Sequence, residues 1–248
     1  MTDIFFVDSV WENELVLTPE ILEHLQAKKV RSLALFASAQ FLKVDKIIEQ
    51  LRAIGVQAVG TKAKRTNTVM QLLGCDIYHN SFEEDIIEGT DATLFIGDGL
   101  FHPKTLLLAQ MNKKSIKEVI VFDPVQQRMR VLNHEIIQDQ IRKARANLKS
   151  YLAASSVGIL VSVKPGQSYI NSALQLKQQV EAQGKKAYVF IDNTIDLLHI
   201  ENYPFIDCWV NTACPRIGSD DMLTIRKPLI NIREAFDPAR ALEMLYLG

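Results

Sequence analysis

Three cysteines are the residues of this chain best suited to chemistry, because a thiolate is both a nucleophile and a metal ligand. Cys214 follows an apolar run, in the segment 210–217 (VNTACPRI), beside a proline and an arginine. Cys75 closes a similar run, 71–76 (QLLGCD), so the two thiols are expected at matching strand ends of two similar units. Arg216 and the N–H groups of its turn would stabilise a thiolate or a sulfide cluster. The pattern predicts one metal site shared between two domains, with Cys75 and Cys214 as ligands.

Cys208 is the third candidate ligand, although alternation along 206–210 favours a place in the apolar core. Zinc is disfavoured, because the sequence has no Cys-x-x-Cys pair and no closely spaced histidine pair. Three thiolates from distant segments instead suit a 4Fe-4S cluster with one iron left open for a substrate.

Two glycine turns could bind an anion at the start of a helix. One contains Gly97, Asp98 and Gly99 and is followed by His102, which could also be a base or a structural histidine. The other, 164–167 (KPGQ), places a cation and an amide where a carboxylate could bind, such as that of S-adenosyl-L-methionine. The alternative is that both segments are ordinary turns that bind no ligand. The candidate binding residues are Gln40, Gly97, Asp98, Gly99, His102, Lys164, Gly166, Gln167 and Arg216.

A repeated strand–helix–strand pattern must position these residues. The first copy has strands at 30–37 and 56–59 around a helix at 41–54, and the second has strands at 157–161 and 187–190 around a helix at 169–182. Further apolar strands are expected at 92–96, 119–122 and 228–230, with helices at 103–111 and 238–245. The alternation predicts an α/β fold with two similar doubly wound, Rossmann-like parallel sheets. Ligands bind such sheets beyond the carboxyl ends of the strands, where the candidates fall.

The same patterns divide the chain into four parts. We expect an N-terminal leader (1–29) with a short helix opening at Thr18-Pro19, an α/β domain (30–133), a linking helix (134–151) and a second α/β domain (152–248).

Composition limits the class of protein. The chain has 248 residues, 48% of them hydrophobic and 23% charged, and a net charge of −1, which is typical of a soluble globular protein. The chain has no excess of basic residues, so direct contact with nucleic acid is not expected. No apolar run is long enough for a membrane span, and the N-terminus does not resemble a signal peptide. Three cysteines suit a reducing compartment, so we expect a cytoplasmic protein.

Four segments carry a family resemblance in one order: 72–76 (LLGCD), 95–103 (FIGDGLFHP), 158–167 (GILVSVKPGQ) and 210–217. Over about residues 30–235 the chain resembles the diphthamide synthase family, the 2-(3-amino-3-carboxypropyl)histidine synthases. The resemblance implies a non-conventional radical enzyme. Its 4Fe-4S cluster cleaves S-adenosyl-L-methionine to a 3-amino-3-carboxypropyl radical, which adds to a histidine of translation elongation factor 2.

The resemblance also implies three similar domains, each giving one cysteine to the cluster. Cys75 matches the cysteine of the second domain and Cys214 that of the third, while the leader has no counterpart of the first domain. We therefore expect a short member lacking the first domain. Cys208, water, a non-cysteine ligand or another chain would complete the cluster, the last as a homodimer or as a heterodimer with a paralogue. The acceptor would be elongation factor 2 or another protein.

Two alternatives stay open. A non-catalytic subunit of a catalytic paralogue would expose apolar leader residues such as Phe5, Phe6, Val7 and Trp11. A metal-free α/β ligand-binding protein would keep the glycine turns and bury every cysteine.

Overall fold

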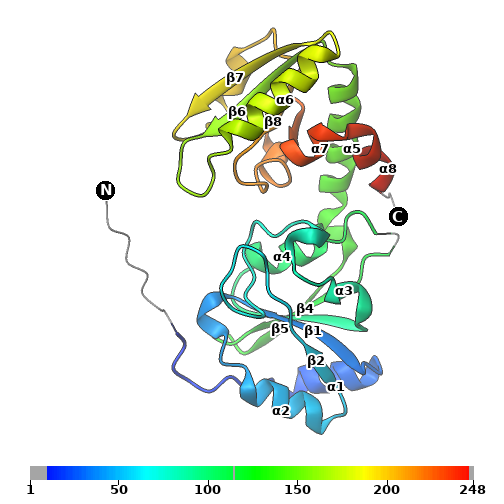
Figure 1. Ribbon diagram of the computed structural model, residues 1–248. Coiled ribbons are helices and arrows are strands. Elements are labelled where there is room, and N and C mark those ends of the chain that lie inside the picture. Colours follow the sequence, from blue (N-terminus) through cyan, green and yellow to red (C-terminus); the bar gives the residue numbers. More distant parts are fainter. Residues whose placement is uncertain (1–9, 114, 246–248) are drawn as a thin grey trace. The chain divides into compact units, whose positions relative to one another are not determined.

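The structure, a computed structural model, describes residues 10–113 and 115–245 and divides into two compact units (Figure 1). Unit 1 runs to Ile136 and unit 2 starts at Ile137, except that residues 111–113 group with unit 2. Each unit is built around its own sheet. The α/β class predicted from the sequence is therefore confirmed.

Unit 1 contains a five-stranded sheet in the order β2-β1-β3-β4-β5. β1, β3 and β4 are buried along almost their whole length, which explains their continuous apolar sequences. The pairs β1–β2, β1–β3 and β3–β4 are parallel, but β5 runs antiparallel to β4 and was not predicted. The strands are β1 (Ser32–Ala37), β2 (Gln57–Val59), β3 (Ala92–Ile96), β4 (Val119–Asp123) and β5 (Arg128–Leu132).

The segment predicted as a leader is part of unit 1. Its helix α1 (Pro19–Ala27) has proline in its first turn and buries Ile21 and Leu25 in the core of the unit. Trp11 packs on Phe41 with ring centroids 5.5 Å apart, so it is not an exposed docking residue within the described chain. Phe5, Phe6 and Val7 lie outside the described residues. The remaining helices of unit 1 are α2 (Asp45–Ala53), α3 (Ile86–Gly89), α4 (Phe101–Leu108) and the 3-10 turns η1 (Ala39–Phe41), η2 (His79–Ser81) and η3 (His134–Ile137).

Unit 2 contains a four-stranded parallel sheet in the order β7-β6-β8-β9. The segment predicted as a linking helix, α5 (Gln138–Ala153), buries Leu148 and Tyr151 in this unit's core. No helix in the described part of the chain is long and apolar enough to cross a membrane. The other elements are β6 (Ser156–Ser162), α6 (Ile170–Ala182), β7 (Lys186–Asp192), η4 (His199–Asn202), β8 (Cys208–Asn211), η5 (Asp221–Thr224), β9 (Leu229–Asn231), α7 (Ile232–Phe236) and α8 (Pro238–Met244).

The repeat expected from the sequence is present in the strand order, because β2-β1-β3-β4 of unit 1 has the same topology as β7-β6-β8-β9 of unit 2. The two units also share a set of hydrogen bonds between the starts of neighbouring strands, here called the polar clamp. Asp91 Oδ2, just before β3, accepts hydrogen bonds from two backbone N–H groups at the start of β1 and from the Ser32 hydroxyl. Asp207 Oδ2, just before β8, does the same at the start of β6 with the Ser156 hydroxyl. The two units therefore share local chemistry as well as topology.

Candidate functional site

The loop that carries Cys75 lies at the carboxyl end of β1. Gln71 pairs in parallel with Ala37, the last residue of β1, and the Leu72 N–H donates to the Ala37 carbonyl at 3.0 Å. This short pairing lies beyond the point where β2 stops pairing with β1. Cys75 is thus held near the edge of the sheet at which ligands bind in doubly wound folds.

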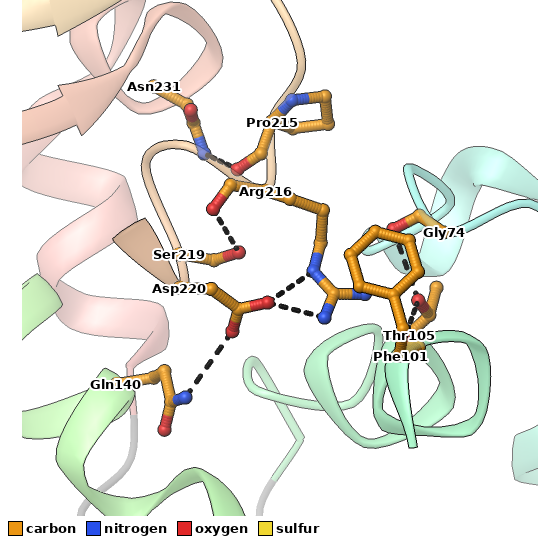
Figure 2. Close-up of polar contacts among 9 residues, drawn as sticks. All are labelled: Gly74, Phe101, Thr105, Gln140, Pro215, Arg216, Ser219, Asp220 and Asn231. Carbon is orange, nitrogen blue, oxygen red and sulfur yellow. Dashed lines mark hydrogen bonds and ion pairs between the residues drawn. The ribbon is translucent and has the colours of Figure 1, made fainter. Parts of the chain in front are cut away.

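Gly74 lets this loop approach helix α4 closely. A Cβ atom on Gly74 would lie 2.1 Å from Cε1 of Phe101, far inside contact distance. The Gly74 carbonyl accepts a hydrogen bond from the Thr105 hydroxyl at 3.1 Å, drawn in Figure 2. A larger residue at this position would force the exposed Phe101 ring to move, so glycine allows this close packing beside Cys75.

Cys75 is half-buried and has a basic neighbour. Arg65 Nη1 lies 3.3 Å from Cys75 Sγ, a contact that favours negative charge on the sulfur. Asp76, the next residue, is almost fully buried, and this burial raises the pKa of its carboxyl group. The hydrogen bond from the Leu73 N–H and the charge of Arg65 act in the opposite direction. No sequence motif marks Arg65, because the contact arises only from the folded loop.

The other unit 1 candidates follow β1 and β3. Gly99 has φ of +66°, a conformation that glycine adopts without strain. A Cβ on Gly97 would lie 2.6 Å from Ser38 Oγ, which is buried without a hydrogen-bond partner among the described residues. The His102 ring stacks on a neighbouring aromatic ring of the core, Phe95, at a centroid distance of 6.4 Å. Ser38 was missed by the sequence reasoning, since a serine after a strand is common.

Gln40 lies in η1, directly after β1, and is half-buried. Its carbonyl accepts a hydrogen bond from the Trp11 N–H at 2.9 Å. In unit 1 the structure thus brings Gln40, Cys75 and the turn 97–99 to the carboxyl ends of two adjacent parallel strands.

Unit 2 has the corresponding arrangement at β6 and β8, which are also adjacent and parallel. The turn 164–167 follows β6, with the Gln167 N–H donating to the Lys164 carbonyl at 3.0 Å and Gly166 at φ of +75°. Cys214 follows β8 and is half-buried. Its carbonyl accepts a hydrogen bond from Asn211 Nδ2 at 2.9 Å. The two predicted site segments of this unit therefore lie at the carboxyl ends of two adjacent strands of its sheet.

Arg216 is buried and has a carboxylate partner. Its Nε donates to Asp220 Oδ2 at 2.6 Å, and its Nη2 also contacts that oxygen. Asp220 Oδ1 in turn accepts a hydrogen bond from Gln140 Nε2 at 3.4 Å, as Figure 2 shows. The guanidinium charge is therefore largely balanced by Asp220, and the ion pair braces the turn that follows Cys214.

Cys208 differs from the other two cysteines. Its side chain is fully buried in the apolar core of unit 2, together with Val210 and Ile159. This burial raises the pKa of the Cys208 thiol to about 12, so it stays protonated. Such a thiol does not suit a metal ligand, which must be a thiolate.

The comparisons with known proteins agree with this fold and these segments. Residues 5–238 match the sequence model of a family described as "Putative diphthamide synthesis protein". The chain belongs to this family. The resemblance expected from the four segments is thereby confirmed.

Two archaeal relatives are named 2-(3-amino-3-carboxypropyl)histidine synthase. The protein of Pyrococcus horikoshii is 29% identical over 177 residues, covering 71% of this chain and 47% of the relative. The protein of Methanocaldococcus jannaschii is 28% identical over 169 residues, covering 66% and 44%. The chain thus spans about half the length of the curated relatives it matches. A crystal structure of Dph2 from Pyrococcus horikoshii with a 4Fe-4S cluster has a TM-score of 0.68, with 25% identity over 92% of this chain and 62% of that one.

The match between the two units corrects one expectation about this family member. Cys75 and Cys214 do not follow matching strands. Cys214 follows β8, whose equivalent in unit 1 is β3, whereas Cys75 lies before β3 in the long segment between β2 and β3. The unit 1 counterpart of the Cys214 turn is the glycine turn 97–99. The error arose because the Cys75 loop reaches the sheet edge through a single isolated pairing rather than through a strand.

The residues present can be tested against the cofactors that the resemblance implies. Among the described residues there is no ready-made group of three His, Cys, Asp or Glu side chains that could hold a metal ion. Cys75 and Cys214, both half-buried beyond strand ends, fit thiolate ligands of a 4Fe-4S cluster, and Cys208 does not. The buried and unpartnered Ser38 hydroxyl beside Gly97 fits a polar group of a bound ligand, within the part of the chain that is described.

Proposed function

We propose that this chain acts in diphthamide synthesis, as an iron–sulfur transferase that moves the 3-amino-3-carboxypropyl group of S-adenosyl-L-methionine to a histidine of a protein acceptor. One observation carries the proposal. The two cysteines that match the family's cluster cysteines, Cys75 and Cys214, are the two that lie half-buried at sheet edges, while Cys208 lies in the core. By likeness to the family, the acceptor is translation elongation factor 2.

In this proposal the chain's own groups hold the sulfur ligands in place. Arg65 favours the thiolate of Cys75, and Asn211 fixes the backbone of Cys214. Asn211 is itself held by Asn231 at 2.7 Å, so the turn is braced from β9. When bound, the cluster supplies the electron that cleaves a carbon–sulfur bond of S-adenosyl-L-methionine.

The binding of S-adenosyl-L-methionine is assigned to the polar groups that follow the strands. In unit 2, the Lys164 ammonium would pair with the carboxylate of its methionyl part, with Gly166 and Gln167 in the same turn. In unit 1, the residues proposed to contribute are Ser38, Gln40, Gly97, Asp98, Gly99 and His102. The buried Arg216 would act by bracing the Cys214 turn through Asp220.

The test is anaerobic reconstitution with iron and sulfide, followed by iron counting and electron paramagnetic resonance of the reduced protein. The expected result is a brown protein that absorbs near ~400 nm, as iron–sulfur clusters do. Its resonance signal should change on addition of S-adenosyl-L-methionine, and 5′-methylthioadenosine should form. A protein that takes up no iron yet still binds S-adenosyl-L-methionine would overturn the proposal in favour of the metal-free alternative. Iron uptake without 5′-methylthioadenosine would favour the non-catalytic subunit.

A further inference from the structure

Two neighbouring strands of unit 2 each end in a buried asparagine. β8 ends at Asn211 and β9 at Asn231, and the two residues lie opposite each other in the parallel ladder. Their exposed fractions are 1% and 5%, and Asn211 Nδ2 donates to Asn231 Oδ1 at 2.7 Å. Burying an amide costs free energy unless its polar atoms are hydrogen-bonded, so the other partners of this pair show what it holds in place.

Those partners are backbone groups on both sides of the candidate ligand Cys214. Asn211 Nδ2 donates to the Cys214 carbonyl at 2.9 Å, and the Ala213 N–H donates to Asn211 Oδ1 at 3.1 Å. From the next strand, Asn231 Nδ2 donates to the Pro215 carbonyl at 2.9 Å (Figure 2). The pair therefore holds three consecutive residues, with the cysteine in the middle.

The chain that follows Cys214 packs closely on the same pair. A Cβ on Gly218 would lie 2.2 Å from Asn231 Oδ1, so only glycine allows the turn to approach this amide. The Ile217 N–H also donates to the Cys214 carbonyl, at 3.0 Å. The carbonyl of the cysteine is thus fixed both by the turn itself and by the asparagine pair.

Unit 1 shows that the fold does not need asparagines at these positions. Counting from the polar clamp of each unit, the equivalent of Asn211 is Phe95. The strand register places Val121 opposite Phe95, as Asn231 is opposite Asn211. Both unit 1 residues are buried and apolar. The polar pair therefore occurs in the unit in which a cysteine, Cys214, directly follows the strand.

We propose that Asn211 and Asn231 are positioning residues that fix Cys214 as a ligand of the cluster. They act through the backbone of residues 213–215, and Asn231 connects that turn to β9. Groups that orient a ligand in this way alter the affinity of a metal site by about 10–100-fold. The inference rests on the proposed function, in which Cys214 binds iron.

The primary variant is Asn231→Val, which introduces the residue type found at the equivalent position of unit 1. Its matched control is Asn147→Val in α5. Asn147 is 3% exposed and donates to the Leu229 carbonyl of β9 at 2.8 Å, so both substitutions remove a buried amide that bonds a backbone carbonyl in the same unit.

The first measurement is made on the reconstituted full chain. We expect the cluster of Asn231→Val to release its iron to a chelator roughly tenfold faster than that of wild type. The g values of the reduced cluster in electron paramagnetic resonance should also shift, because a displaced ligand alters the iron it binds. Asn147→Val should match wild type in both measurements. Equal behaviour of the two variants would overturn the proposal.

The second measurement needs no cluster. In the iron-free chain, iodoacetamide should alkylate Cys214 roughly threefold faster or more in Asn231→Val, because a turn that has lost its bond to β9 opens more often. The rate is measured on the Cys214 peptide by mass spectrometry, with Cys75 as the internal reference. Equal rates in Asn231→Val and Asn147→Val would overturn the proposal.

The two measurements separate this inference from the proposed function. A wild-type chain that takes up no iron would overturn the proposed function, while the alkylation rates would still decide whether the pair holds Cys214. If circular dichroism shows that Asn231→Val does not fold, Asn231→Asp replaces it. That variant keeps the shape and the acceptor for Asn211 but cannot donate to the Pro215 carbonyl, so the same results are expected.

Discussion

At the scale of the residue, the surroundings of each cysteine decide its chemistry. Cys208 and Cys214 are six positions apart in the sequence, yet one is fully buried among apolar side chains and the other is half-buried beyond the strand end. Burial holds the pKa of the Cys208 thiol at about 12. A ligand thiol must lose its proton, so the buried Cys208 is not suited to bind iron, whereas Cys214 lies outside the apolar core.

The first prediction concerns these cysteines. We expect Cys214→Ala to abolish iron uptake on reconstitution while the circular dichroism spectrum stays unchanged, because the side chain is not part of the core. Cys75→Ala should have the same effect. Cys208→Ala is the control: it should keep its iron but lose on the order of 1 kcal/mol of stability, because it leaves a small cavity. Normal cluster content in Cys214→Ala would show that Cys214 is not a ligand of the cluster.

Arg65 offers a second test at this scale. Its guanidinium lies 3.3 Å from Cys75 Sγ and favours the thiolate, which is the form that reacts with alkylating agents. We expect Arg65→Met to slow alkylation of Cys75 by iodoacetamide at pH 7 by roughly threefold or more. The rate is measured on the Cys75 peptide by mass spectrometry, with Arg52→Met on the exposed side of α2 as the control. Equal rates in both variants would show that the contact does not influence the sulfur.

At the scale of the element, polar clamps join the starts of neighbouring strands in both units. Hydrogen bonds from the Arg31 and Ser32 N–H groups hold the pKa of Asp91 below its ordinary value. Those from the Ser156 and Ser155 N–H groups do the same for the pKa of Asp207. Lysines add to the pattern: Lys117 Nζ donates to carbonyls just before β3, and Lys227 Nζ to carbonyls just before β8. The amino ends of the central strands are thus fixed by charge-assisted bonds.

These lowered pKa values give a pH-dependent prediction. A carboxylate whose pKa is lowered by folding stabilises the protein above its unfolded pKa of about 3.9, and this contribution is lost as pH falls through the folded pKa. We therefore expect Asp207→Asn and Asp91→Asn to be less stable than wild type at pH 7. The difference should shrink as the pH falls below ~4.

The measurement is urea unfolding at several pH values. Asp139→Asn is the control, because that carboxylate is largely exposed and contacts one arginine side chain, Arg142. Differences for Asp91 and Asp207 that stay constant with pH would show that their charge is not what stabilises the clamps.

Packing within one sheet gives another prediction. A Cβ on Gly158, in the central strand β6, would lie 2.4 Å from Cε3 of the fully buried Trp209. We expect Gly158→Ala to destabilise unit 2 by about 1–3 kcal/mol, because the indole cannot move without disturbing the core. Gly89→Ala is the matched control, since nothing lies within 4 Å of its added Cβ. The free energies of unfolding of the two variants are compared in urea. Equal values would mean that the core around Trp209 rearranges to accommodate the added methyl group.

At the scale of the whole molecule, the sequence predicted what depends on local pattern. Buried strands such as β1 and β6 appear as continuous apolar runs, and glycines with positive φ, Gly55 and Gly184, mark the ends of equivalent helices. β5 was missed because it is a charged edge strand that returns through a tight turn. The contact of Arg65 with Cys75 and the unpartnered Ser38 hydroxyl could not be predicted either. Both depend on how an irregular loop meets a sheet, which no local pattern encodes.

The edge strands of the two sheets give a last prediction, which hydrogen exchange can test. In β7 the backbone groups of Lys186 and Asp192 face β6, so those of Tyr188 and Phe190 do too, while the amide of Val189 points away from the sheet. Val189 should therefore exchange quickly and its two neighbours slowly. The edge strand β5 offers the same comparison, because Arg130 faces Val121 of β4 and Val131 points outward, so Val131 should exchange faster than Arg130. Equal exchange at the outward and inward amides of either strand would show that the strand opens as a whole, since only the inward amides are held by a neighbouring strand.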